Sequence, residues 1–425
     1  MATKKIHLVA ADMGYGHQRA AYPLLGLSAG EVITINDYRG IPDWEKKYWI
    51  NSLRSYEKIS RLNKIPLFGS AVFAVMDAFQ KIHDFYPFRD LSRPTVQQEY
   101  FFKFIKKGLG KTLIDKLNKN KLPFVTTFFV AAYIAEYHNY QGDIYCIICD
   151  TDASRAWAPL KPEMSRVKFL VPSEKVRTRF LMYGVKPENI FVSGFPLPKE
   201  NIGTRQEIIK QDLSARVRNL DPKNKYSEIY QPLLSSLNFK KDKVIRPLSL
   251  MFAVGGAGAQ KEIGALVLKK LAAKIKNKEL SLSLVAGSRA EVRDYFQKKI
   301  KAQGLKEGSG VKVIFASDKL KYFKIFNSVL RETDILWTKP SELSFYAALG
   351  VPIIMSTPVG SQEDFNREWL LNIGSGVDSP EAEFVDEWLP DLLNSGRLAR
   401  AAVDGFLNAN SLGVYKIEKL LLKKK

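Results

Sequence analysis

The sequence has only two cysteines among its 425 residues. Both lie in the run Cys146-Ile147-Ile148-Cys149. A Cys-x-x-Cys pair can act in redox chemistry, but two isoleucines separate these thiols, and residues 144–149 have the composition of a buried strand. We therefore predict structural cysteines, with neither a redox nor a metal role.

Long apolar runs are also missing. No stretch of about 18 or more uncharged apolar residues occurs, so we expect no transmembrane helix. The opening Met-Ala-Thr-Lys-Lys leads directly into an expected strand, without the apolar region and cleavage site of a signal peptide. We expect the protein in the cytoplasm.

Acidic residues are few relative to basic ones. The chain has 44 Asp and Glu against 65 Lys and Arg, a net charge of +21. This excess favours an anionic partner. Because zinc-finger spacings, RNP motifs and Arg-rich arms are missing, we expect no nucleic acid. An anionic cytoplasmic leaflet is the better match, and simple solubility is the alternative that charge alone leaves open.

The chain is too long for one compact core and predicts two domains of roughly 150–200 residues each. Each half begins with a strand and a glycine loop and continues as alternating strands and helices. The expected strands are 5–10, 32–36, 124–130, 144–149 and 168–171, then 248–254, 280–286, 311–316 and 351–355. This α/β pattern predicts two Rossmann-like domains facing across a cleft. The expected boundaries are 1–197 for the first domain, 198–246 for a linker with an irregular helical excursion, 247–400 for the second domain and 401–425 for a helix with a basic tail.

The first glycine loop carries two proton-transfer groups. The strand at 5–10 is followed by Asp12, Gly14, Gly16 and His17, and by small residues that can start a helix. Glycine permits a positive φ or close approach of a ligand, and a helix N-terminus attracts anions. An imidazole suits acid–base chemistry at neutral pH. The loop therefore predicts a site, while a generic α/β turn with a structural histidine is the alternative.

The order Asp-x-Gly-x-Gly-His-x-x-Ala-Ala resembles the first loop of the GT-B glycosyltransferases that glycosylate membrane lipids. These are the monogalactosyldiacylglycerol synthases, the processive diacylglycerol glucosyltransferases and, more distantly, the N-acetylglucosaminyltransferase of peptidoglycan synthesis. The resemblance implies a GT-B fold and a sugar transfer from a nucleotide sugar, most often a UDP sugar, without a metal or cofactor. It also implies that His17 or Asp12 is the catalytic base.

The resemblance continues after the strand at 144–149. Thr151 and Asp152 follow that strand and Trp157 comes next, in the order of the family. The likeness implies that these three residues contact the acceptor. The sequence departs from the pattern at residues 154–156, where the family has a histidine. Arg155 stands there, and we expect it to replace the positive character of that histidine on the acceptor side.

The second half resembles the family's donor site. Backbone N–H groups of its glycine loop and of a following helix would bind the diphosphate, and two basic side chains would add charge to the leaving group. The donor and phosphate candidates are Gly14, Gly16, Gly255, Gly256, Gly258, Arg289, Lys339, Ser341, Glu342, Gln362, Glu363 and Asn366. The alternative for the last three is an exposed polar loop.

One segment of the donor half departs from the family. Ser341 can cap a helix that runs to Leu349 and ends at Gly350. The family has a glutamate five residues before this glycine, where Phe345 stands here. Glu342 lies three residues earlier, on roughly the same helix face, and we expect it to hold the donor ribose hydroxyls.

Residues 44–125 combine aromatic side chains with interleaved lysines and arginines. The most apolar part, 66–76, is short for a membrane span and suits a core helix or an interfacial one. Core packing is the commoner explanation of such a pattern. Together with the Lys-rich tail, the segment predicts reversible attachment of the first domain to an anionic membrane surface, with residues 68–76 inserting at the interface.

The expected substrates are thus a nucleotide-sugar donor and a lipid or lipid-linked acceptor. Two alternatives stay open. A nucleotide-sugar epimerase would use the same two-domain architecture. A non-catalytic membrane-binding protein on the same fold is suggested by the departures at 154–156 and 341–345, although both Asp12 and His17 are present.

Overall fold

The computed structural model describes residues 5–62, 82–237, 246–255, 260–358 and 361–422. The chain divides into two compact units. Unit 1 comprises Met1–Pro196, Gly360–Phe365 and Leu412–Lys425; unit 2 comprises Leu197–Val359 and Asn366–Ser411. The expected interfacial residues 68–76 and two predicted donor glycines, Gly256 and Gly258, lie outside the described residues.

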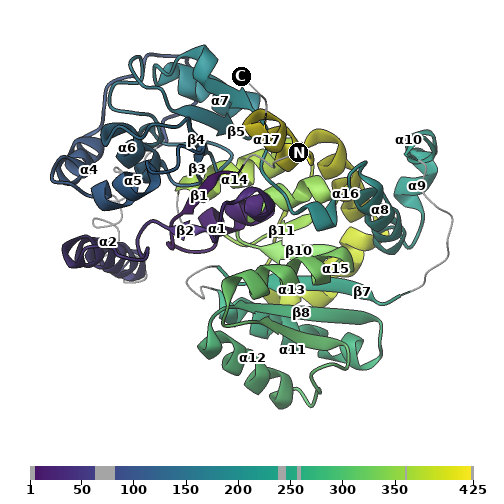
Figure 1. Ribbon diagram of the computed structural model, residues 1–425. Helices are drawn as coiled ribbons and strands as arrows, with labels where there is room; N and C mark the ends of the chain where they lie inside the picture. Colours follow the sequence, from purple (N-terminus) through teal and green to yellow (C-terminus); the bar gives the residue numbers. More distant parts are fainter. Residues whose placement is uncertain (1–4, 63–81, 238–245, 256–259, 359–360, 423–425) are drawn as a thin grey trace. The chain divides into compact units, whose positions relative to one another are not determined.

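Unit 1 is built on a parallel six-stranded sheet with the order β2-β1-β3-β4-β5-β6 (Figure 1). Its strands are β1 (His7–Ala10), β2 (Ile33–Thr34), β3 (Phe124–Thr126), β4 (Ile144–Ile147), β5 (Lys168–Val171) and β6 (Ile190–Val192). The central strands are short apolar runs, and every residue of β3 and β4 is buried. Burial on both faces is what a parallel sheet covered by helices requires.

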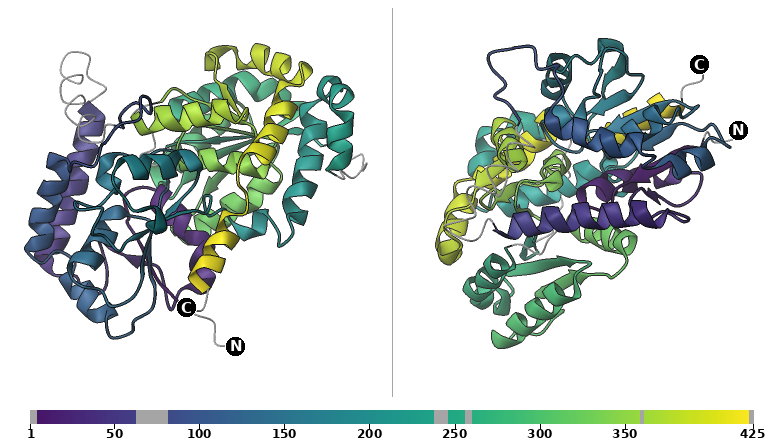
Figure 2. Two further views of the ribbon diagram at one scale, coloured as in Figure 1. Left: turned by 90° about the horizontal axis from the view of Figure 1, so that it is seen from above. Right: turned by 90° about the vertical axis from the view of Figure 1, so that its left-hand side faces the viewer.

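The helices of unit 1 follow its strands and carry the apolar side chains that cover the sheet. They are α1 (Gly16–Ala21), α2 (Asp43–Leu62), α4 (Val96–Lys106), α5 (Lys111–Leu117), α6 (Phe129–Tyr137), α7 (Glu174–Met182) and α17 (Gly413–Leu422), with 3₁₀ turns η1 (Tyr22–Leu27), η2 (Arg155–Trp157) and η3 (Pro187–Asn189). The C-terminal helix α17 returns to this unit and packs beside η1 (Figure 2). The last helix of the chain is thus part of the first unit.

Unit 2 has a second parallel six-stranded sheet, with the order β12-β11-β10-β7-β8-β9. Its strands are β7 (Leu248–Ala253), β8 (Leu280–Gly287), β9 (Val311–Phe315), β10 (Ile335–Thr338), β11 (Ile353–Met355) and β12 (Gly376–Asp378). The core between this sheet and its helices includes the buried indole of Trp337 on β10.

The other elements of unit 2 are mostly the crossovers between its strands. They are η4 (Lys199–Asn201), α8 (Glu207–Leu220), α9 (Lys225–Ile229), α10 (Gln231–Ser236), α11 (Lys261–Lys276), α12 (Ala290–Ala302), α13 (Lys319–Arg331), η5 (Glu342–Leu349), η6 (Ala382–Phe384), α15 (Val385–Asn394) and α16 (Arg397–Asn408). Helix α14 (Ser361–Asn372) begins among the residues of unit 1 and ends among those of unit 2.

The predicted α/β class with two Rossmann-like domains is confirmed. The expected strand 124–130 is too long, because it ends at Thr126 and the following apolar residues form the buried helix α6. A continuous apolar run does not distinguish a buried strand from a buried helix. Strand β12 was not predicted, because its Gly-Val-Asp sequence has weak strand propensity.

The described residues up to 237 of the segment 198–246, expected to form a linker with an irregular helical excursion, are mostly helical and belong to unit 2. Helix α8 packs against α16, and its Arg216 is buried. The Arg216 guanidinium donates to the backbone carbonyls of Thr333 (2.7 Å), Leu349 (3.0 Å) and Gly350 (2.9 Å). Burial lowers the pKa of Arg216 to about 10. These bonds tie α8 to the end of η5 and to the turn between α13 and β10, and make it part of the unit.

Candidate functional site

The loop between β1 and α1 is held by a side chain from the turn that follows β2. The backbone N–H of Asp12 donates to Asn36 Oδ1 (2.8 Å), and Asn36 Nδ2 donates to the Asp12 carbonyl (3.1 Å). Gly14 has a φ of +107°, which L side chains rarely adopt, although a Cβ there would meet no neighbouring atom. The role of Asn36 was not predicted, and its only signal in the sequence was its place at the end of the expected strand 32–36.

His17 lies in the first turn of α1 and is fixed by Thr127, which directly follows β3. The ring Nδ1 lies 2.6 Å from the Thr127 carbonyl oxygen, and the Thr127 hydroxyl donates to the His17 carbonyl (2.9 Å). A carbonyl oxygen only accepts, so Nδ1 carries the proton, and Nε2 carries the lone pair of the neutral ring. This tautomer presents Nε2 as a base.

Two aromatic rings lie beside the same imidazole. The centroid of His17 lies 5.1 Å from that of Phe128 and 6.1 Å from that of Trp157. Trp157 in turn packs against Phe129 at 5.0 Å. The structure therefore brings together two of the predicted residues, His17 and Trp157, and adds Thr127 and Phe128.

The His17 site lies where the strand order of unit 1 reverses. Both β2 and β3 pair with β1, and the chain continues outward from β3 to β6. Open parallel sheets bind ligands outside the carboxyl ends of the strands at such a switch point. The loop after β1 and residue Thr127 after β3 occupy this position.

Asp152, predicted to contact the acceptor, makes a buried ion pair with Arg179, which was not among the predicted site residues. Arg179 of α7 donates from Nε to Asp152 Oδ1 (2.9 Å) and from Nη2 to Oδ2 (2.8 Å). Both side chains have no exposed surface. The neighbouring Thr151 is buried as well. The carboxylate of Asp152 therefore joins the loop after β4 to α7, and its acceptor contact stays a prediction that this geometry does not favour.

Arg155 is also occupied by the fold. It is buried, and its guanidinium donates to the Ser92 carbonyl (3.2 Å from Nε and 2.6 Å from Nη2) and to the Ala158 carbonyl (2.8 Å). Burial lowers the pKa of Arg155. These bonds hold the segment around Ser92 against η2 and argue against the predicted acceptor contact of this cation.

In unit 2, three predicted donor residues follow three adjacent strands. Gly255 comes after β7, Arg289 after β8 and Lys339 after β10. The chain runs outward from β7 in one direction and from β10 in the other, so Gly255 and Lys339 flank the switch point of this sheet. The Lys339 side chain packs on Gly255: a Cβ at Gly255 would lie 2.8 Å from Lys339 Cε.

The predicted helix after Lys339 exists as the 3₁₀ helix η5, and Gly350 ends it with a φ of +68°. The expectation that the Ser341 side chain caps it is wrong, since that side chain makes no capping hydrogen bond. Ser341 and Glu342 are both partly exposed at the start of this helix. Phe345 is buried and packs against Trp369 (centroids 5.3 Å apart), so its position serves the core.

The last three predicted donor residues lie in the first half of α14. Gln362 and Glu363 are partly exposed, whereas Asn366 is buried. Residues three and four apart share a face of a helix. Both Gln362 and Glu363 are therefore neighbours of Asn366 on the surface of α14. Gln362 and Glu363 belong to unit 1, whereas Asn366 belongs to unit 2.

Both cysteines are buried free thiols, as predicted. Burial raises the pKa of the Cys146 thiol, which disfavours the reactive thiolate. Within the described ranges, no helix is both long and apolar enough to cross a bilayer, and no cluster of three or more His, Cys, Asp or Glu side chains suits a metal ion.

Two doubly wound parallel sheets, each with its polar loops at the switch point, define a protein of the GT-B fold. Residues 236–309 and 301–420 match a family described as a domain of unknown function (DUF6938). The chain is 21% identical over 298 residues to the processive diacylglycerol beta-glucosyltransferase of Bacillus subtilis (strain 168). This match covers 69% of the chain and 65% of that protein, so the chain spans a little under two thirds of the relative's length. The relative is one of the enzyme types that the first loop resembles, which confirms the predicted resemblance.

The chain is also similar to two solved structures. MnaA of S. aureus, determined with UDP, gives a TM-score of 0.50 at 11% identity and covers 97% of this chain and 95% of its own. MurG of Acinetobacter baumannii gives a TM-score of 0.47 at 14% identity, with coverage of 99% and 100%. At these identities the likeness to MnaA establishes the fold alone.

If the buried ion pair between Arg179 and Asp152 has a structural role, its loss should lower the stability of the protein. Arg179→Met should lower the free energy of unfolding by about 3–5 kcal/mol, because it leaves the Asp152 carboxylate buried without its cation. Urea denaturation measures this loss. Arg177→Met, a half-exposed arginine on the same helix, is the matched control and should change stability by less than about 0.5 kcal/mol. Equal stability of the two variants would contradict the structural role.

Proposed function

We propose that this protein transfers a sugar from a UDP sugar to a hydroxyl group of a lipid or lipid-linked acceptor. The observation that carries the proposal is the 2.6 Å contact between His17 Nδ1 and the Thr127 carbonyl, which leaves the lone pair of the neutral imidazole on Nε2. A general base needs this lone pair in a fixed direction. The resemblance to the diacylglycerol glucosyltransferase supports the same assignment.

In the proposed reaction, His17 Nε2 takes the proton of the acceptor hydroxyl as its oxygen attacks the anomeric carbon. The bond between that carbon and the diphosphate oxygen breaks, and UDP leaves with the bonding electrons. Arg289 and Lys339 would stabilise the negative charge that develops on the diphosphate, an interaction that strengthens as the bond breaks. Asp12, on the same loop, is the second candidate base. No metal or cofactor is needed for these steps.

The donor assignment rests on the switch point of unit 2. Gly255 lets the backbone after β7 approach a phosphate closely, and Lys339 lies against it. Glu342 is proposed to hold the ribose hydroxyls, and Gln362, Glu363 and Asn366 are proposed to contact the sugar. The structure of MnaA with UDP supports a nucleotide ligand for this fold.

The acceptor assignment and a peripheral location at the cytoplasmic face of a membrane are supported by the surface of unit 1. Several of its large apolar side chains are exposed, among them Tyr86 (71%), Phe88 (61%), Val96 (75%) and Tyr100 (54%). Arginines and lysines, such as Arg89 and Arg93, alternate with them along the chain. Aromatic and basic side chains together suit an interface with anionic lipid.

The base is tested by His17→Ala. Turnover of a panel of UDP hexoses and UDP N-acetylhexosamines with diacylglycerol in mixed vesicles should fall by at least about 10²-fold, the effect of losing a general base, while the KM for the donor changes little. His7→Ala is the control, since this imidazole contacts the Asn120 carbonyl at the opposite end of β1. Turnover equal to that of the unaltered protein would exclude His17 as the base.

The same assay without acceptor distinguishes the epimerase alternative. A transferase should release free UDP slowly and leave the configuration of the sugar unchanged. Accumulation of an isomerised sugar nucleotide would instead establish the epimerase.

The donor site is tested by Gly255→Ala. The new Cβ would displace the flexible end of Lys339, so UDP affinity should fall by about tenfold, as expected for one charge-assisted hydrogen bond, with little loss of stability. Lys339→Met should have a similar effect, and the double variant should lose little more, because the two changes act on one contact. Isothermal titration with UDP measures both. Lys312→Met, an exposed lysine on β9, is the control, and a loss of affinity as large as that of Lys339→Met would contradict the assignment.

Membrane attachment is tested by vesicle sedimentation. Binding should require anionic lipid and weaken as the salt concentration rises, because the Debye length falls from about 10 Å at 0.1 M to about 3 Å at 1 M. Tyr86→Ser with Phe88→Ser should reduce the part of the binding that persists in high salt. The matched control is Ile229→Ser with Tyr230→Ser, an exposed apolar pair of unit 2. Equal recovery with neutral and anionic vesicles, or none with either, would favour a soluble acceptor.

A further inference from the structure

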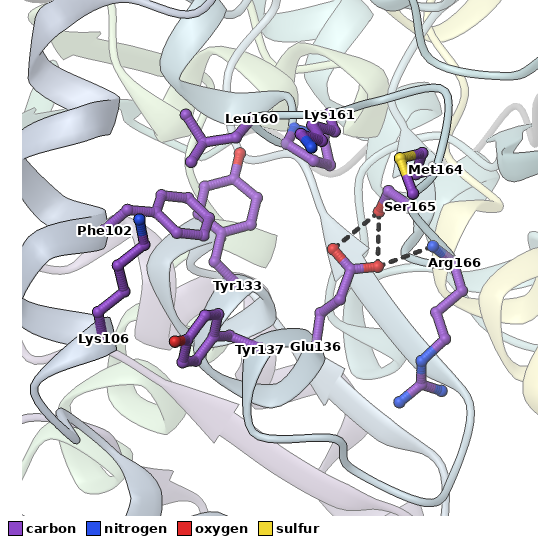
Figure 3. Close-up of a pocket in the computed structure, with 11 residues that line it drawn as sticks. Phe102, Lys106, Tyr133, Glu136, Tyr137, Leu160, Lys161, Met164, Ser165 and Arg166 are labelled. Atoms are coloured by element: carbon purple, nitrogen blue, oxygen red, sulfur yellow. Dashed lines mark hydrogen bonds between the residues drawn. The ribbon is translucent and has the colours of Figure 1, made fainter.

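Unit 1 contains a cavity of about 500 Å³ between α4, α6 and residues 159–166 (Figure 3). This volume is within the range of small-molecule sites. The cavity lies along α6 away from His17: Phe129, at the start of α6, packs on Trp157, whereas Tyr133 and Tyr137 line the cavity one and two turns later. At 1.5 Å per residue, Tyr137 lies about 12 Å along the helix from Phe129. The cavity is therefore distinct from the proposed catalytic site.

Aromatic and aliphatic side chains form most of the cavity wall. Phe102 of α4 packs on Tyr133 of α6, with ring centroids 5.5 Å apart. Tyr137 and Met164 line the opening with exposed fractions of 46% and 73%. Exposed apolar side chains around a preformed hollow provide a surface for an apolar ligand.

Hydrogen bonds fix the loop that forms the second wall. Gln98 of α4 is buried and donates to the Ala158 carbonyl (2.5 Å), which holds the start of the loop. At its end, the Glu136 carboxylate of α6 accepts from the Ser165 hydroxyl (2.8 and 3.0 Å) and from the Arg166 N–H (2.7 Å). Figure 3 shows the bonds of Glu136 to Ser165 and Arg166 as dashed lines. The wall is therefore held in place without a ligand, and the carboxylate of the cavity is already engaged.

The charge of the cavity is positive. Lys106, Lys161 and Arg166 line it, against the single carboxylate of Glu136. Figure 3 shows Lys106 and Lys161 on either side of the Phe102 and Tyr133 rings. Both lysines are exposed, and within the described part of the chain neither makes an ion pair. Ammonium groups beside an apolar hollow match a ligand with a phosphate head and an apolar body.

We propose that this cavity binds one molecule of an anionic phospholipid. Its apolar part lies against Phe102, Tyr133 and Tyr137, and its phosphate pairs with Lys106 and Lys161. This is a second lipid site, separate from the acceptor at His17, and it would hold a single lipid of the leaflet in addition to the general attraction of the basic surface.

The test is isothermal titration of the full chain with dihexanoylphosphatidic acid below its micelle concentration. One molecule should bind per chain. Glycerol phosphate, which has the head alone, and dihexanoylphosphatidylcholine, which has a zwitterionic head, should each bind at least about tenfold more weakly. Lys106→Ala with Lys161→Ala should weaken the binding of the acid by about tenfold or more. Lys103→Ala with Lys107→Ala removes the same charge from the region of α4 without altering the cavity and should have little effect.

Three results would overturn the proposal. Equal affinity for glycerol phosphate would indicate a site for free phosphate. Equal affinity for the phosphatidylcholine would indicate an apolar groove without charge recognition. A loss in the Lys103 and Lys107 variant as large as in the cavity variant would indicate nonspecific attraction. Because no sugar donor is present, failure here leaves the proposed sugar transfer unaffected, and failure of the His17 test leaves this site unaffected.

Discussion

The pairing of β1 with β3 is the constraint on which the His17 site depends. These strands lie more than 110 residues apart in sequence, yet parallel hydrogen bonding sets Val9 opposite Thr126. Thr127 therefore emerges at the same sheet edge as the loop that carries His17. The Thr127 carbonyl, just after β3, meets the imidazole of His17 on α1 there. This contact determines which ring nitrogen of His17 carries the proton. A one-residue slip of this register would send Thr127 away from the ring.

The same topological rule explains why each unit has its polar loops at one place. In both sheets the chain proceeds outward from a central strand pair, β1 with β3 and β7 with β10. Crossovers that pass over opposite faces leave a crevice between the two central strands at their carboxyl ends. Glycine is needed where the backbone must turn within this crevice, as at Gly14. The two units thus have a crevice at the same position of the sheet, lined by loops of different sequence.

Much of the fold was predictable because strand runs such as 144–149 are apolar, short and followed by turn residues. The loop residues His17 and Trp157 were predictable as a pair only through their order in a known motif. Asn36, Thr127 and Arg179 were not, because each acts through a contact across 24 to 110 residues of sequence that no local pattern records. The helical nature of residues 129–137 was hidden for a different reason: a helix buried on nearly all sides has no polar face to set its period.

Buried charges separate the residues that hold this fold from those available to a ligand. Residue type alone does not show whether Asp152, Arg155 and Arg216 bind a ligand. In the structure, each makes hydrogen bonds to other parts of the fold. A charge removed from water is tolerated only when such bonds replace its hydration, so burial with full pairing indicates a structural role. Lys106 and Lys161 show the opposite combination, exposed ammonium groups at the edge of an apolar hollow. Within unit 1, it is this difference in solvation, rather than the number of basic residues, that locates a site for an anion.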